Sequence, residues 1–158
     1  KKEQEKNSRT ISVEDRVLCS TGRELMKADG SSTGRTIPVK EKITYRELLK
    51  HNSINCSSVI LRRDVAREFP MEHDDSHEDY ITWLKILRKY GCAAGINKPY
   101  LKYRLSEGGK SRNKLKSAAM TYNVYRYAGY GRIRSCIFFC SYAVHGIWKY
   151  CYCSLRSQ

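Results

Sequence analysis

Acidic side chains are scarce in this sequence. Asp and Glu together number 16, against 30 Lys and Arg, and the formal net charge is +14. From residue 106 to the end, Glu107 is the single acid, and the same stretch holds ten aromatic residues between Tyr122 and Tyr152. A positive surface interleaved with rings suits a membrane interface or a nucleic acid. Composition alone does not choose between these two partners.

Several other features are missing. The sequence has no internal repeat and no low-complexity tract, which excludes solenoids and repetitive fibrous proteins. With 10 Gly, 3 Pro and a hydrophobic fraction of 41%, it also differs from disordered chains. Its 158 residues are enough for one domain with a sizeable core.

The cysteines do not form a recognisable disulfide framework. There are seven, an odd number, and their spacings do not resemble a small secreted scaffold. No secretory signal pattern opens the sequence. We therefore expect reduced thiols in a cytosolic setting, with Cys19, Cys56 and Cys92 in the core.

Strand and helix patterns alternate along the first two thirds of the sequence and predict an α/β fold. Expected strands cover residues 16–26, 34–39, 53–61, 92–96 and 100–105, and the first two form a hairpin around Asp29-Gly30. Expected helices begin at Thr44, with Glu47 completing a capping box, at Asp64, and at Glu78, the last running to Tyr90 and ending at Gly91. Two further helices follow, from about residue 115 to 126 and from 136 to 153. We also expect the charged run 1–7 to be compatible with a helix.

The last helix is mostly apolar over eighteen residues. His145, Gly146 and Lys149 make it a poor transmembrane span. An amphipathic helix lying in the plane of a membrane surface fits this pattern better.

One segment, residues 72–79, concentrates the acids that are scarce elsewhere. It holds five of the sixteen, directly ahead of the helix that carries Trp83. Crowded carboxylates raise each other's pKa, and a carboxylate with a raised pKa is a better general base. A structural alternative stays open, because Ser76 with Asp79 three residues later is an ordinary capping pattern and first-turn acids offset the helix dipole. His73 and His77 are spaced as on one helix face, but the segment lacks the HExxH order, and we assign no metal ligands.

Three ordered segments carry a resemblance to a known family. They are ITYRELLKHNSINCSSVILRRD, FPMEHDDSHEDYITWLKILRKYG and INKPYLKYRLSEGGKSRNKLKSA. Together they resemble the second half of family 2 glycosyltransferases of bacterial capsular and exopolysaccharide synthesis. The resemblance implies the C-terminal part of a GT-A, Rossmann-like domain over residues 1–113, followed by a basic, aromatic helical tail over residues 114–158.

The resemblance also implies roles for two acids. Asp79 corresponds to the base that takes the proton from the acceptor hydroxyl while that oxygen attacks the anomeric carbon with inversion. Glu78 would shape the site and increase its negative potential. The implied substrates are a nucleotide-sugar donor and a saccharide or lipid-linked acceptor.

One departure from the family pattern concerns the metal. Such transferases hold Mn²⁺ or Mg²⁺ with an Asp-x-Asp motif in their first half, and this sequence has no such motif. We expect the divalent ion in the full-length enzyme, with its ligands outside this chain. Because departure of a nucleoside diphosphate requires its charge to be neutralised, we expect the chain alone not to transfer sugar.

Weaker correspondences suggest further substrate-binding residues. Arg104, Lys110 and Ser111 lie on a segment that in the family resembles a loop closing over the donor phosphates, and a solvated charged loop explains them equally well. His51, with Asn52, either lines the acceptor cleft or forms an ordinary turn after a helix.

The tail has two interpretations. It would bind anionic lipid at the inner face of the bacterial plasma membrane, or merely pack on the domain. The competing function is a basic nucleic-acid-binding module. The acidic segment would repel phosphate, and no RRM, KH, zinc-finger or helix-turn-helix signature is present, so we expect no nucleic-acid partner in a cytoplasmic enzyme.

Overall fold

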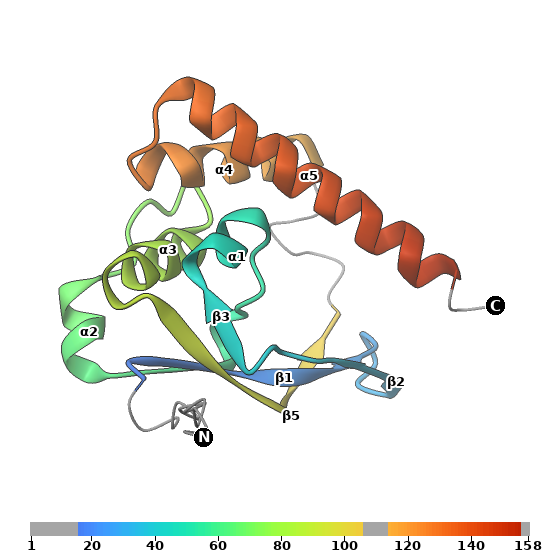
Figure 1. Ribbon diagram of the computed structural model, residues 1–158. Helices are drawn as coiled ribbons and strands as arrows, with labels where there is room; N and C mark the ends of the chain where they lie inside the picture. Colours follow the sequence, from blue (N-terminus) through green and yellow to red (C-terminus); the bar gives the residue numbers. More distant parts are fainter. Residues whose placement is uncertain (1–15, 106–113, 156–158) are drawn as a thin grey trace, which may run out of the picture.

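The computed structural model describes residues 16–105 and 114–155. The predicted run 1–7 and the predicted contacts of Lys110 and Ser111 lie outside these residues. Figure 1 shows helices packed on a mixed sheet, which confirms the predicted α/β character of the chain. Among the described helices, none is long and apolar enough to cross a membrane.

One twisted, mixed sheet forms the base of the molecule. Its strands are β1 (Leu18–Met26), β2 (Ser32–Ile37), β3 (Lys42–Thr44), β4 (Val59–Leu61) and β5 (Cys92–Arg104). The order is β2-β1-β5-β3, and β4 pairs with β1 on the side that β2 also occupies. β1 and β5 run parallel, whereas the other pairs are antiparallel.

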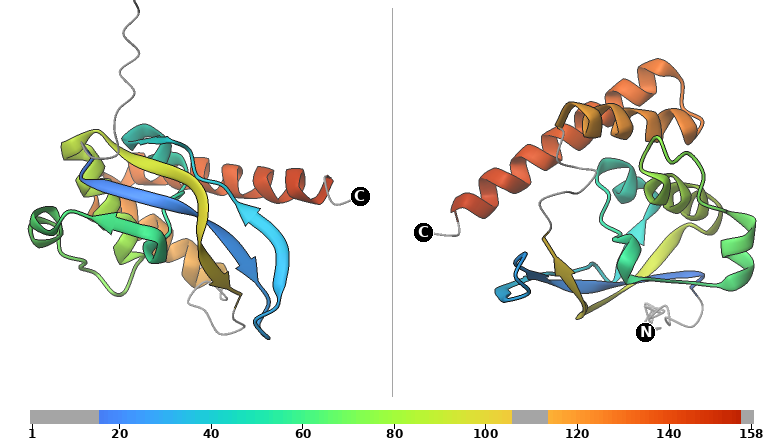
Figure 2. Two further views of the ribbon diagram at one scale, coloured as in Figure 1. Left: turned by 90° about the horizontal axis from the view of Figure 1, so that it is seen from below. Right: turned by 180° about the vertical axis from the view of Figure 1, so that it is seen from behind.

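The helices lie on one side of this sheet. They are α1 (Tyr45–Lys50), α2 (Arg63–Glu68), α3 (Glu78–Tyr90), α4 (Lys114–Tyr127) and α5 (Arg132–Leu155). Helices α1 and α3 are next to the sheet, and α4 and α5 form an outer layer over them (Figures 1 and 2). The long α5 therefore crosses above α1, far from it in sequence.

The core fills the space between the sheet and α1, α3 and α4. Its largest fully buried side chains are Trp83, Tyr80, Tyr125, Leu18, Ile43 and Leu48. The stripe predicted for α3 is confirmed, since Tyr80, Trp83, Leu84 and Leu87 are all buried. Burying these side chains orients α3 so that its first turn lies at the edge of the core.

Several local predictions are confirmed. Thr44 and Glu47 form the predicted capping box at the start of α1. Helix α3 has the predicted bounds and ends at Gly91, whose φ of 85° suits a residue without a Cβ atom. The hairpin of β1 and β2 forms around Asp29-Gly30.

Other local predictions are wrong. The buried strand expected over residues 53–61 is a loop, a 3₁₀ turn at Cys56–Ser58 and the short β4, where Ile60 is 67% exposed. The three residues of β4 pair with the edge of β1, so they are not enclosed on both faces. Asp64 does not cap α2, since Arg62 is the N-cap and Asp64 pairs with it in the first turn.

The two strands predicted on either side of Asn97-Lys98-Pro99 form one strand, β5. Its register against β1 shifts around Gly22, opposite Pro99. The irregularity accommodates the proline, which cannot donate a ladder hydrogen bond. Because β5 remains continuous, it extends alongside β1 and places Tyr103 beside Arg23.

Candidate acceptor site

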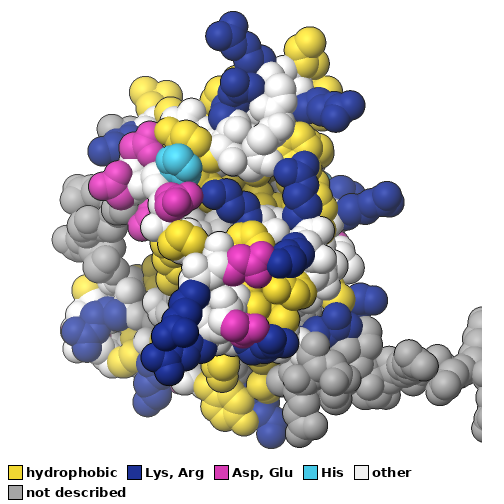
Figure 3. Space-filling view, turned by 90° about the vertical axis from the view of Figure 1, so that its left-hand side faces the viewer, with side chains coloured by type: hydrophobic (Ala, Val, Ile, Leu, Met, Phe, Trp, Pro, Cys, Tyr) yellow, Lys and Arg dark blue, Asp and Glu magenta, His cyan; other side chains and the backbone are white. Residues whose placement is uncertain are grey.

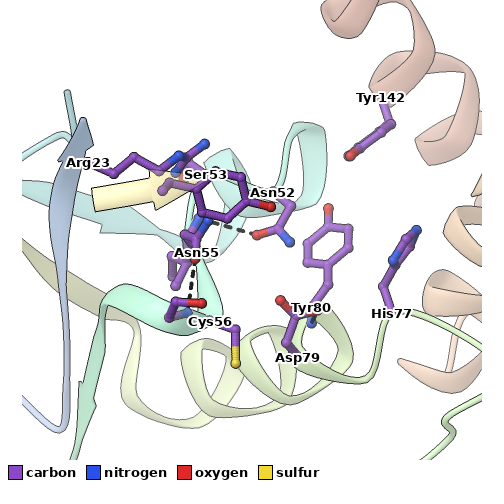
Figure 4. A pocket seen from close by; sticks show the side chains of 12 residues that line it. Arg23, Asn52, Ser53, Asn55, Cys56, His77, Asp79, Tyr80 and Tyr142 are labelled. Atoms are coloured by element: carbon purple, nitrogen blue, oxygen red, sulfur yellow. Dashed lines mark hydrogen bonds between the residues drawn. The ribbon is translucent and has the colours of Figure 1, made fainter. Parts of the chain in front are cut away.

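A cavity of about 340 Å³ opens at the start of α3. Its walls come from β1, the loop after α1, the start of α3, the end of β5 and the middle of α5 (Figure 4). The side chains that carry polar chemistry into it are Arg23, Asn52, Asn55, Cys56, His77, Asp79, Tyr103 and Tyr142. Residues far apart in sequence thus surround Asp79, the carboxylate predicted as the base.

Asp79 is the second residue of α3 and lies in the wall of the cavity. Burial is the first cause of its raised pKa, and the neighbouring charge of Glu78 raises the pKa further. The backbone N–H of Tyr80, which donates to Asp79 Oδ1 at 2.7 Å, and His77 act in the opposite direction. The predicted rise is present, but desolvation contributes more to it than carboxylate crowding.

The capping alternative for this segment is not supported. His77 is the N-cap of α3 and makes no side-chain capping bond. Ser76 is fully buried, and its Oγ donates to the backbone carbonyl oxygen of Met120 at 2.8 Å, tying the loop to α4. Glu78 and Asp79 do occupy the first turn, where negative charge offsets the helix dipole. That favourable interaction also helps to hold Asp79 at the cavity.

The remaining acids of residues 72–79 face solvent instead of the cavity. On the face that carries α2 and α3, acidic side chains gather beside a histidine, while Lys and Arg are spread over the rest (Figure 3). Asp75 accepts a hydrogen bond from the Tyr127 hydroxyl at 2.8 Å, and the His73 ring stacks on Tyr127 with centroids 3.8 Å apart. These contacts attach the loop to α4, so the loop has a structural role.

The same segment offers no metal site. His73 lies ahead of α3, with a φ of 69°, and therefore does not share a helix face with His77. Among the side chains that the structure describes, no three from His, Cys, Asp or Glu are grouped so that they could hold a metal ion. The described residues thus do not fit the divalent ion implied by the family resemblance.

The loop after α1 forms the wall opposite α3. Asn52 Oδ1 accepts from the Ile54 backbone N–H at 3.2 Å, and Asn55 Oδ1 accepts from Ser57 N–H at 2.9 Å. These bonds shape the loop and leave both side-chain NH₂ groups available as donors. In Figure 4, the side chain of Asn52 lies between those of Asn55 and Tyr80.

Cys56 is exposed in this wall, which corrects the prediction that it belongs to the core. Cys19 and Cys92 are buried as predicted. Partial burial of the sulfur, followed by the nearby charges of Asp79 and Glu78, raises the pKa of the Cys56 thiol. The charges of the two carboxylates therefore act on the Cys56 thiol.

Arg23, Tyr103 and Tyr142 are cavity residues that sequence analysis missed. Arg23 extends from β1 across the cavity from Asp79 (Figure 4), and its guanidinium carbon lies 5.7 Å from the centroid of the Tyr103 ring. Partial burial lowers the pKa of Arg23. The signal in the sequence was an arginine directly after the small and apolar strand residues LCSTG. Tyr142 enters from α5, which no local pattern connects to α3.

The other predicted site residues lie outside this cavity. His51 is the C-cap of α1, lines a neighbouring cavity, and has its ring centroid 6.0 Å from that of Tyr142. Glu78 is next to Asp79 but is not part of the wall. Arg104 is exposed at the end of β5, near the Gly30 turn.

The chain is similar in sequence to bacterial glycosyltransferases. It is 36% identical over 106 residues to TuaG of Bacillus subtilis, provisionally named a teichuronic acid biosynthesis glycosyltransferase, which covers 67% of the chain and 42% of TuaG. Two Escherichia coli proteins, WfaP and WfgD, are named as UDP-Glc:alpha-D-GlcNAc-diphosphoundecaprenol beta-1,3-glucosyltransferases. They are 36% identical over 114 residues and 40% identical over 88 residues.

The matches cover only part of these relatives. WfaP is matched over 70% of the chain and 44% of its own length, and WfgD over 53% and 33%. The chain thus spans less than half the length of the curated relatives described here. No family model and no solved structure matches it. The similarity confirms the predicted resemblance to glycosyltransferases of bacterial polysaccharide and lipid-linked sugar synthesis.

Proposed function

We propose that this chain is the acceptor-binding, base-carrying part of an inverting, GT-A-type family 2 glycosyltransferase. The observation that carries the proposal is the position of Asp79, a carboxylate of raised pKa in the wall of a polar cavity. Similarity to glycosyltransferases over most of the chain supports the reaction class. The substrates are a nucleotide sugar and a saccharide or lipid-linked acceptor.

Asp79 acts as the general base in this proposal. The acceptor hydroxyl gives its proton to the Asp79 carboxylate while its oxygen forms a bond to the anomeric carbon. The bond from that carbon to the diphosphate breaks, the nucleoside diphosphate leaves with the electron pair, and the configuration inverts. A hydroxyl is a weak nucleophile near neutral pH, and a positioned base contributes about 10²–10⁴-fold to the rate.

The wall opposite Asp79 orients the acceptor. The NH₂ groups of Asn52 and Asn55 donate to sugar hydroxyl or ring oxygens, because the carbonyl ends of these side chains already hold the loop. Tyr142 provides an aromatic side chain at the opening, and Glu78 adds negative potential beside the base. The acceptor is therefore bound between α3 and the loop after α1.

The donor is bound mainly by a nucleotide-binding part beyond this chain. The relatives contain more than twice the matched length, which is room for such a part. In the full-length enzyme, Arg104, Lys110 and Ser111 would approach the donor phosphates, and Mn²⁺ or Mg²⁺, held by residues outside this chain, would supply charge neutralisation for the diphosphate. The mechanism in this chain uses only its own side chains.

The C-terminal helices hold the enzyme at the inner face of the plasma membrane in this proposal. Ile133, Ile137 and Val144 are 79%, 60% and 63% exposed on α5, and their spacing places them on one helix face. Arg132 and Arg134 are exposed on either side of that face. An apolar stripe between cationic side chains suits an anionic membrane surface.

Co-sedimentation with anionic liposomes tests this membrane contact. Replacing Ile133 and Ile137 with Asn should reduce binding severalfold, while Ile60→Asn, at an equally exposed site on β4, should not. Equal liposome binding by the unaltered protein, the variant with both Ile133 and Ile137 replaced, and Ile60→Asn would contradict the membrane contact.

The proposed reaction is tested by assaying the full-length enzyme with a set of sugar nucleotides and a diphosphate-linked lipid sugar. Release of nucleoside diphosphate must depend on the acceptor, and NMR of the product should show an inverted anomeric centre. The 158-residue chain alone should show no transfer. Retention of configuration, or turnover by the isolated chain, would overturn the corresponding part of the proposal.

A further inference from the structure

A second cavity adjoins the candidate acceptor site. It has a volume of about 550 Å³ and shares Arg23, Asn52 and Ser53 with the cavity that contains Asp79. Its floor is apolar, from Ile37 to Val39 and at Ile43, and α5 reaches it through His145. The two cavities therefore meet at Arg23, with the Asp79 carboxylate in one of them and α5 beside both.

The wall of the second cavity is basic. Arg23, Lys40, Lys50, His51 and His145 line it, with Glu47 as the single acid. Glu47 is already engaged, because it pairs with Lys40 at 2.7 Å and accepts from the Thr44 backbone N–H at 3.0 Å. These contacts lower the pKa of Glu47 to about 2, with the Lys40 bond as the largest cause. The Lys40–Glu47 pair is neutral overall, so Arg23 and Lys50 leave a positive excess.

Arg23 in particular lacks an anionic partner in the part of the chain that the structure describes. None of the four ion pairs there includes it, and its neighbour is the ring of Tyr103. Arg23 is partly buried, and removing a guanidinium from water without a carboxylate partner is unfavourable, so this partial burial lowers the pKa of Arg23. Its planar fork of N–H donors matches the oxygens of a phosphate group.

We propose that Arg23 and the second cavity bind a phosphate or diphosphate group of the substrate while the reacting hydroxyl lies at Asp79. The inference rests on the proposed function and specifies its substrate as an anionic one. The position of the cavity beside α5 favours the diphosphate of a lipid-linked acceptor as the source, because α5 carries the exposed apolar stripe. The donor diphosphate is the other source of the same chemistry.

Titration of the chain with inorganic pyrophosphate tests the site itself. At about 0.15 M salt, where distant surface charges are largely screened, Arg23→Gln should weaken binding by about tenfold or more. Arg67→Gln makes the same charge change at an exposed position on α2 and should alter it less than twofold. Lys50→Gln, also exposed, should weaken binding severalfold and provides a second test if Arg23→Gln folds poorly. Binding by all variants within twofold of the unaltered chain would overturn the site.

Kinetics of the full-length enzyme distinguish the two sources. Arg23→Gln should raise KM for a diphosphate-linked lipid sugar by about tenfold, with little effect for the matching alkyl glycoside that lacks phosphate. An equal loss with both acceptors, together with a raised KM for the donor, would overturn the acceptor assignment in favour of the donor. If the chain binds pyrophosphate through Arg23 but the full-length enzyme transfers no sugar, the anion site stands and the proposed function is refuted. If the enzyme transfers sugar but all variants bind pyrophosphate as the unaltered chain does, the proposed function stands and the anion site is refuted.

Discussion

The hydroxyl of Tyr125, on α4, donates a hydrogen bond to the backbone carbonyl oxygen of Leu49 at 2.8 Å. The Tyr80 hydroxyl, from α3, donates to the neighbouring carbonyl of Leu48 at 2.5 Å. The last carbonyls of a helix have no partner within it, so these buried hydroxyls satisfy the end of the short α1. The loop with Asn52 begins two residues later, and the two tyrosines thereby hold it opposite Asp79.

Removing the Tyr125 hydroxyl should weaken this connection. Tyr125→Phe leaves the Leu49 carbonyl without that donor inside the core, and we expect the free energy of unfolding to fall by about 1–3 kcal/mol. Tyr100→Phe is a matched control, because Tyr100 is 69% exposed. Urea denaturation of the two variants measures the difference, and equal midpoints would show that the bond to α1 is unimportant.

At Gly95, β5 passes very close to the backbone of Lys40. A Cβ atom built there would lie 1.9 Å from the carbonyl oxygen of Lys40, whereas one at Gly146 on α5 would meet nothing within 4 Å. We expect Gly95→Ala to cost about 3 kcal/mol or more, and Gly146→Ala to be neutral or stabilising by up to about 1 kcal/mol. Thermal unfolding compares the pair. A Gly95→Ala protein as stable as the original would contradict the close approach.

The elements that could be predicted are those specified by neighbouring residues. The capping box of Thr44 and Glu47, and the apolar stripe of α3 with its terminating Gly91, depend on contacts within a few positions. The segment 53–61 has a strand composition, but its conformation depends on lying at the sheet edge beside β1. That position is a long-range property, and local patterns do not contain it.

Burial of Asp79 should make stability depend on pH. Its pKa is raised in the folded chain, so ionisation of Asp79 opposes folding at neutral pH, and the penalty vanishes below the ordinary range of an Asp carboxyl. Asp79→Asn should therefore raise the unfolding temperature at pH 7 and leave it unchanged near pH 3. Asp74→Asn, at an exposed position, should have no such pH-dependent effect. Lower stability of Asp79→Asn at pH 7 would contradict the raised pKa.

Cys56 reports on the charge of Asp79. The carboxylate raises the pKa of this exposed thiol, and only the thiolate reacts rapidly with an alkylating reagent. Asp79→Asn should therefore increase the rate of Cys56 alkylation severalfold at pH 7.5, as measured by peptide mass spectrometry. Cys136, exposed on α5, is an internal control whose rate should not change. Unchanged Cys56 reactivity would mean that the two groups do not interact.

The candidate site was only partly visible in the sequence. Asp79 stood out because acids are rare and its helix start was clear, whereas the burial that raises its pKa depends on the folded chain. Arg23 and Tyr103 meet through the parallel pairing of β1 with β5, about eighty positions apart. No spacing rule connects them, so only the folded chain places Arg23 across from Asp79.

Asp79→Asn in the full-length enzyme tests the central claim most directly. Measured with donor and acceptor at saturation, kcat should fall by about 10²–10⁴-fold, because the variant cannot accept the proton of the acceptor hydroxyl. The dissociation constant of the nucleotide sugar should stay unchanged, and Asp74→Asn should keep full activity. Turnover by Asp79→Asn within tenfold of the original enzyme would contradict the assignment of Asp79 as the base.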